Sequence, residues 1–269
     1  MKARTGTEVG SGAATVALAS HSLLLVLALE VVFSLAFVLT LPSLVDHRDM
    51  WRLALGLTSK AAMAGAIAFV WMRGVTMSWV AGRALTSRWE LVRATLIGSL
   101  AGATMFALLR VGEFESARGS EQVLSSAHVL AWASAVIAAP LLEELLFRGI
   151  LLRALLRRSS TPAAIIASAL VFSAFHYFPV RMVSSLALGV LVGAMLVRTG
   201  SVWPCVAAHA AWNLTARVLK LFEGTREVTT SEEFDPLGMM LPSLAVTAAL
   251  VAGLLVLARS DRRAAGNGE

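Results

Sequence analysis

Six polar side chains interrupt long apolar runs in the second half of the sequence. Two glutamates and an arginine share one run, a histidine stands in the next, and a histidine and an asparagine share a third. The six are Glu143, Glu144, Arg148, His176, His209 and Asn213. A carboxylate and an imidazole can together hold and deprotonate a water, while a second imidazole and an amide can donate hydrogen bonds to a tetrahedral oxyanion. These residue types suit attack of water on a carbonyl carbon. Neither a G-x-S-x-G nor an H-E-x-x-H motif occurs.

Helical spacing sorts the first group by role. Glu144 and Arg148 are four residues apart, with the glutamate on the N-terminal side, so they should share a helix face and form a salt bridge. Glu143 points about 100° away around the helix and has no partner in its own turn. It must find one on another helix or contact water. An unpaired, partly desolvated carboxylate suits a general base, and we therefore expect Glu143 to be the base.

The depth of the residues in their helices is consistent with one shared site. Glu143 precedes Arg157, and His176 follows Pro162, by the same fourteen residues. At about 1.5 Å per residue both side chains would lie roughly 21 Å from the same edge of the bundle. His209 would lie about 12 Å from that edge by the same rise, within a turn or two of the level of the other two residues. Neighbouring antiparallel helices can therefore bring the carboxylate and both imidazoles together.

The composition shows which elements must position these side chains. Of 269 residues, 57% are hydrophobic and 15% are charged, and the mean hydropathy is +0.75. Soluble domains are less apolar and carry more charge, which argues against a soluble enzyme, a disordered tail and a nucleic-acid-binding domain. The net charge of +6 comes from arginines at the ends of apolar runs, as expected for membrane topology. Cys205 is the one cysteine, so an internal disulfide is excluded.

The sequence contains eight apolar stretches, each bounded by charged residues, proline or glycine. We predict that they are helices, because backbone groups in lipid must hydrogen-bond within their own segment. They lie at about 15–41, 54–72, 91–111, 126–156, 162–178, 182–198, 201–221 and 237–258. The predicted fold class is all-α, a polytopic membrane helix bundle with about eight transmembrane helices. The first stretch is too long for the apolar part of a signal peptide and is expected to be a retained span.

The distribution of basic residues predicts the orientation. Eight spans place both termini on one side of the membrane. Thirteen lysines and arginines would lie on that side and eight on the other. The bias places both termini in the cytoplasm.

Three motifs in this order resemble a known family, the CAAX protease and bacteriocin-processing (CPBP) intramembrane endopeptidases. That family has E-E-x-x-x-R, F-x-x-x-H and H-x-x-x-N motifs on separate helices. The corresponding residues here are Glu143, Glu144 and Arg148; Phe172 and His176; and His209 and Asn213. The resemblance covers about residues 126–221, taken as the catalytic core of a single membrane domain, 1–269. The polar termini are 1–14 and 259–269.

The resemblance implies a glutamic endopeptidase that needs no metal and no cofactor. By motif position Glu143 would be the base, and His176 would help to activate water. His209 and Asn213 would form the oxyanion hole. The residues giving structural support would be Glu144, Arg148 and Phe172.

The family also implies the kind of substrate. Its members trim prenylated CAAX tails, take part in bacteriocin maturation or immunity, or, as myxosortase-type proteases, process C-terminal sorting tails. Arginine outnumbers lysine twenty to three, which favours a GC-rich bacterial genome and a bacterial cytoplasmic (inner) membrane. We therefore expect the partners to be the lipid bilayer and a membrane-anchored or secreted protein or peptide, with no nucleic acid. The sequence carries no signal for an oligomeric state.

Two other interpretations use the same residues. Glu143, His176 and His209 are a suitable ligand set for a catalytic zinc ion. Alternatively, intramembrane polar residues can couple ions in a transporter, a proton relay or an immunity scaffold. Four further polar residues in or near the apolar stretches receive no role: Lys60, Glu30, His21 and His128.

Overall fold

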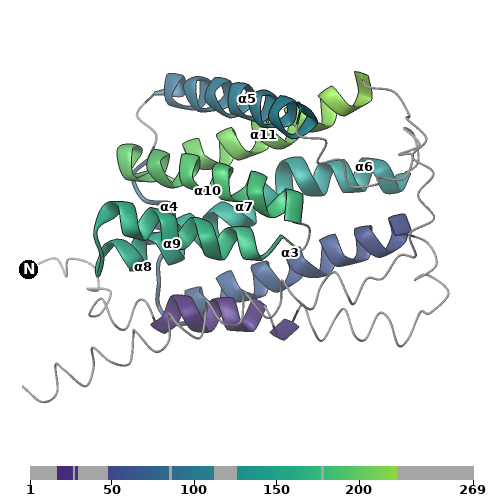
Figure 1. Cartoon of the computed structure of the whole chain (residues 1–269). Coiled ribbons are helices and arrows are strands. Elements are labelled where there is room, and N and C mark those ends of the chain that lie inside the picture. Colours follow the sequence, from purple (N-terminus) through teal and green to yellow (C-terminus); the bar gives the residue numbers. More distant parts are fainter. Residues whose placement is uncertain are drawn as a thin grey trace, which may run out of the picture.

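The fold was obtained as a computed structural model, and it is a bundle of helices that run back and forth along one direction (Figure 1). The structure describes residues 17–26, 28–29, 48–84, 87–111, 126–176 and 179–222. Within these ranges there is no strand, only an isolated bridge between Gly82 and Ser201. The all-α membrane bundle expected from the sequence is confirmed.

Every predicted apolar stretch within the described residues contains a helix. The bounds are Ala17–Val26 for the first helix, then α3 Arg48–Met72, α4 Met77–Ala81, α5 Arg88–Val111, α9 Thr161–Ala174, α10 Pro179–Thr199 and α11 Trp203–Phe222. Pro162, Pro179 and Pro204 lie in the first two positions of α9, α10 and α11, where a missing N–H breaks no helical hydrogen bond. The last predicted stretch, 237–258, and both polar termini lie outside the described residues.

The fourth stretch is a continuous helix whose geometry changes along its length. It consists of α6 Ser126–Ala133, the π-helix η1 Ser134–Ala138, α7 Ala139–Glu143, the π-helix η2 Glu144–Leu152 and α8 Arg153–Leu156. The uniform α geometry expected from the sequence is therefore wrong for Ser134–Ala138 and Glu144–Leu152. A π turn bonds residues five apart and often occurs at functional sites.

Proline explains one free carbonyl in this helix. In the π register of η1, the N–H of Ala139 donates to the carbonyl of Ser134. The next donor in that register would be residue 140, but Pro140 has no N–H. The carbonyl of Ala135 is therefore left without its helical partner, and a side chain from another helix can bind it.

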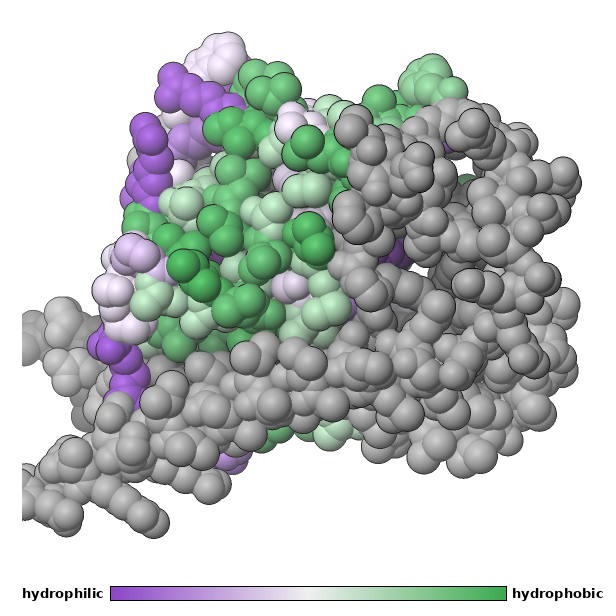
Figure 2. Space-filling model, in the orientation of Figure 1, coloured by the Kyte–Doolittle hydropathy of each residue, from purple (hydrophilic) through white to green (hydrophobic). Residues whose placement is uncertain are grey.

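The surface of the bundle is suited to lipid. On α5, the large apolar side chains of Trp89, Leu96, Leu100 and Leu108 are exposed. Figure 2 shows an apolar face, with hydrophilic residues gathered along its left edge. By length and composition, two helices in the described part of the chain can cross a membrane, Arg88–Leu109 and Arg181–Thr199.

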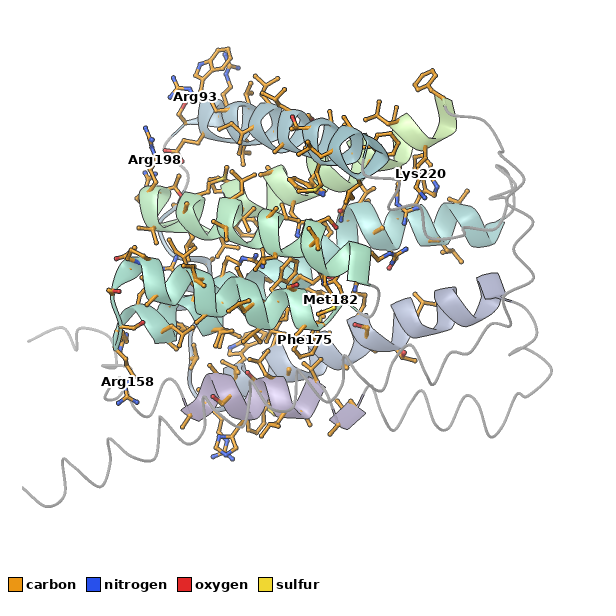
Figure 3. The ribbon with its side chains drawn as sticks, in the orientation of Figure 1. Arg93, Arg158, Phe175, Met182, Arg198 and Lys220 are labelled. Atoms are coloured by element: carbon orange, nitrogen blue, oxygen red, sulfur yellow. The ribbon has the colours of Figure 1, made fainter. Side chains whose placement is uncertain are left out.

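Basic side chains mark one end of the bundle. Arg93, Arg198 and Arg158 lie one below another along the left end of the bundle in Figure 3, whereas Lys220 lies toward the right, at the far end of α11. This placement agrees with the prediction that the three arginines share one side of the membrane. The assignment of that side to the cytoplasm stays a prediction.

Two glycines bring α5 against α11, the helix that carries His209. A Cβ atom on Gly98 would overlap the carbonyl oxygen of Ala208, and one on Gly102 would lie 3.1 Å from the Cα of Trp212. Gly98 and Gly102 form a G-x-x-x-G pattern, which allows two helix backbones to approach closely in a membrane. The close approach of α11 to α5 therefore depends on the absence of side chains at Gly98 and Gly102.

Gly98→Ala should destabilise the protein, because the added methyl group has no space beside the Ala208 carbonyl. Overpacking typically costs about 1–3 kcal/mol. Gly56→Ala on α3 is the matched control: its Cβ would meet nothing within 4 Å, and alanine has the higher helix propensity. Thermal unfolding in detergent should show a lower midpoint for Gly98→Ala alone. Equal midpoints for the two variants would contradict the packing argument.

Candidate active site

Four helical segments contribute side chains to one buried cluster. The helix from α7 to η2 supplies Glu143, Glu144 and Arg148, and α11 supplies His209. His176 lies two residues beyond the end of α9. These five residues come from all three predicted motifs, and the structure brings them together. A fourth segment, α3, adds a residue that the motif analysis left unassigned.

Glu144 and Arg148 form the predicted salt bridge. The Nε atom of Arg148 lies 3.1 Å from Oε2 of Glu144, and neither side chain is exposed. The contact is an ion pair without the alignment of a hydrogen bond, and none of the guanidinium nitrogens has a hydrogen-bond partner in the described structure. The guanidinium instead lies over the ring of Phe172, 4.2 Å from its centre, a favourable cation–π arrangement. Arg148 thus connects Glu144 to α9.

His209 is held between the two glutamates. Its Nδ1 atom lies 2.7 Å from Oε1 of Glu144, and its Nε2 atom lies 3.9 Å from Oε2 of Glu143. A carboxylate only accepts hydrogen bonds, so Nδ1 carries the hydrogen in this contact. Nε2 is therefore the atom that faces the proposed base. The sequence analysis paired Glu144 with Arg148 and did not predict this second contact.

Glu143 is paired with a side chain from another helix. The Nζ atom of Lys60 on α3 donates a hydrogen bond to Oε1 of Glu143 over 2.8 Å. The sequence analysis gave Lys60 no role, and the structure corrects this. Of the two predicted options for Glu143, a partner on another helix is the one observed. The available signal was a lysine inside the apolar stretch 54–72, where an ionisable group usually has a function.

His176 is oriented by its own motif. Its Nδ1 atom lies 3.0 Å from the carbonyl oxygen of Phe172, which can only accept, so Nδ1 carries the hydrogen and Nε2 has the free lone pair in the neutral ring. The ring packs edge-on against Phe172 with centres 4.9 Å apart. His176 and Glu143 also interact electrostatically.

The turn that carries His176 is tied to the next helix. The hydroxyl of Ser173 donates to the carbonyl oxygen of Met182 over 2.6 Å, and the N–H of His176 donates to the carbonyl of Ser173 over 2.9 Å. Phe175 and Met182 mark the end of α9 and the start of α10 in Figure 3. The sequence analysis placed His176 inside a helix spanning 162–178. The helix ends earlier, at Ala174, so a hydrogen-bonded turn holds the imidazole.

Asn213 binds the free carbonyl in η1. Its Nδ2 atom donates to the carbonyl oxygen of Ala135 over 2.8 Å, the oxygen that Pro140 leaves without a helical donor. The amide therefore connects α11 to the helix that carries the glutamates. One of its two N–H groups remains for another acceptor.

The zinc interpretation receives no geometric support from the described side chains. Among the residues that the structure describes, no group of three or more His, Cys, Asp or Glu side chains is arranged to hold a metal ion.

Comparison with known proteins gives one result, and it falls on the segment with the motifs. Residues 125–215 match the family described as Rce1-like type II CAAX prenyl endopeptidases. Neither the curated proteins nor the solved structures give a match. The matched segment contains all three motifs, from Glu143 to Asn213. The match supports the resemblance of this segment to the CPBP family of intramembrane endopeptidases, which its three motifs suggested.

Proposed function

We propose that this protein is a glutamic intramembrane endopeptidase in which Glu143 and His176 activate the water that cleaves a peptide bond. The observation that carries the proposal is the convergence of Glu143, His176 and His209 from three helical segments in one largely buried cluster. Ionisable groups at membrane depth are costly, so such a cluster is expected to have a function.

The proposed reaction begins with a water beside Glu143. Oε1 of Glu143 is occupied by Lys60, which leaves Oε2 to accept a proton. The free lone pair of His176 at Nε2 can accept the second hydrogen bond of the same water. The water oxygen attacks the carbonyl carbon as Glu143 takes the proton. The same proton then passes to the leaving amide nitrogen, and the C–N bond breaks.

The oxyanion would be bound by α11. Asn213 retains one amide N–H beside the one that binds Ala135. His209 can donate from Nε2 when both of its ring nitrogens carry hydrogen, because Nδ1–H already binds Glu144. Donors at the position where negative charge develops lower the barrier to tetrahedral intermediates.

The proposed substrate is a membrane-anchored or secreted bacterial protein or peptide, cut near the membrane. The matching family is described by its action on CAAX prenyl substrates. The arginine-rich composition instead favours a bacterial chain, for which a C-terminal sorting tail, as in myxosortase-type members, or a secreted peptide is the proposed target. The proposed location is the inner membrane, with both termini in the cytoplasm.

The purified full chain in lipid nanodiscs should cleave a peptide probe. The probes are an internally quenched CAAX peptide with a farnesyl group and the same peptide without it. Cleavage of either probe that persists in a metal chelator supports the proposal. Loss of cleavage in chelator, restored by added zinc, would instead support the zinc interpretation. Cleavage of neither probe, together with no change of protein termini in cells, would contradict an endopeptidase.

Asn213→Ala should reduce kcat by about 10²-fold or more, the usual loss for one oxyanion donor. The matched control is Leu214→Ala, because Leu214 is the exposed neighbour of Asn213 on α11. The peptide assay measures kcat, and thermal unfolding measures the cost of losing the bond to Ala135. A wild-type kcat for Asn213→Ala would remove this residue from the oxyanion site.

A further inference from the structure

We propose that Lys60 is a positioning residue for the catalytic carboxylate, holding Oε1 of Glu143 so that Oε2 faces the reacting water. This inference rests on the proposed role of Glu143 as the base. Lys60 lies on α3, outside the segment that matches the family, so neither the motifs nor the comparison assigns it a role.

The charge around Glu143 supports this role for Lys60. The carboxylate of Glu143 is 6% exposed, and burying it without a counter-ion would be costly. Arg148 lies against Glu144 and Phe172. The groups that face Glu143 from other helices are Lys60 on α3, His209 on α11 and His176 after α9. Among these three, Lys60 makes the ion pair at hydrogen-bond distance, with Nζ 2.8 Å from Oε1, whereas Nε2 of His209 lies 3.9 Å from Oε2.

The contact with Lys60 also sets the orientation of the Glu143 carboxylate. The hydrogen bond from Nζ of Lys60 to Oε1 is short, at 2.8 Å. The other oxygen, Oε2, lies 3.9 Å from Nε2 of His209, which is too far for a direct hydrogen bond. This separation still allows one water molecule to hydrogen-bond both atoms. Because Lys60 occupies Oε1 of Glu143, Oε2 is the oxygen left to bind the water.

Lys60 is also partly accessible. The Lys60 side chain is 18% exposed, more than the glutamate that it binds. Its long side chain reaches the cluster from a helix that packs against α7. A small amine should therefore be able to enter the space left by truncating the lysine. This property allows positioning to be separated from folding.

The test uses the full chain in nanodiscs with the same peptide probes. Lys60→Met should lower kcat by about 10²-fold, the scale of loss for a misplaced catalytic group, with little change in KM. Lys60→Arg should retain most of the activity, and methylammonium should restore activity to Lys60→Ala. Lys220→Met, at the far end of α11, is the matched control. A wild-type kcat for Lys60→Met, or a loss that neither arginine nor methylammonium corrects, would overturn the proposal.

An infrared measurement separates this inference from the proposed function. Without its counter-ion, Glu143 should bind a proton, because an uncompensated buried charge is costly. A carboxylic-acid carbonyl band should therefore appear in Lys60→Met and disappear in the double variant Lys60→Met/Glu143→Gln. If the wild type cleaves neither probe but the band appears, the endopeptidase proposal fails and the counter-ion role of Lys60 stands. If the band does not appear, Lys60 is not the counter-ion that keeps the Glu143 carboxylate ionised, and the proposal is wrong.

Discussion

Glu143→Gln is expected to abolish peptide cleavage while the protein still inserts and folds. Glutamine has nearly the same shape, and its carbonyl oxygen can still accept the hydrogen bond from Lys60. It cannot take a proton from water, and general-base catalysis contributes about 10²–10⁴-fold to such reactions. Proteomics of N-terminal and C-terminal peptides, in cells with the wild type or the variant, should reveal termini that only the wild type produces.

Glu90→Gln is the matched control for this experiment. Glu90 lies near the start of α5, where its carboxylate pairs with Arg83 outside the cluster. It should yield the same protein termini as the wild type. If Glu143→Gln produces these termini at the wild-type rate, Glu143 is not the base and the proposed mechanism is wrong.

Arg148→Met is expected to produce the largest loss of stability among these variants. Arg148 is fully buried and paired with Glu144, which is also fully buried. Removing the guanidinium leaves a buried carboxylate without its cation, and breaking such a pair typically costs about 3–5 kcal/mol. It also removes the cation–π contact with Phe172. Chemical unfolding in detergent should show the loss directly, and the membrane yield should fall with it.

Two further variants show whether charge is the cause. Arg198→Met changes an exposed arginine near the end of α10 and should leave unfolding nearly unchanged. Adding Glu144→Gln to Arg148→Met removes the uncompensated charge and should recover part of the stability, because replacing both partners costs less than breaking the pair. Unfolding of Arg148→Met at the wild-type denaturant concentration would show that the ion pair is not a major source of stability.

The features that the sequence predicts well depend on one helix at a time. The length of each apolar stretch predicts a helix, because backbone N–H and C=O groups in lipid must hydrogen-bond to each other. The contact between Glu144 and Arg148 follows from spacing within a single helix. The meeting of Glu143 with His209 agrees with antiparallel neighbours that carry these polar groups to within a turn or two of the same level.

The missed features depend on how one helix is rotated against another or on irregular geometry. Neither the pairing of Lys60 with Glu143 nor the second contact of Glu144 is set by local spacing. The π turns replace the assumed α period just where the site is built. Pro140 was visible in the sequence, but its effect on Ala135 depends on the register that the helix adopts.

The bond between Lys60 and Glu143 joins residues 83 positions apart, and this bears on how the protein can be shortened. A fragment cut to residues 125–215 would keep every motif residue. It would nevertheless lose the amine of Lys60, which binds the carboxylate of Glu143. It would also lose Gly98 and Gly102, against which α11 packs. We therefore expect the smallest active fragment to extend well upstream of residues 125–215.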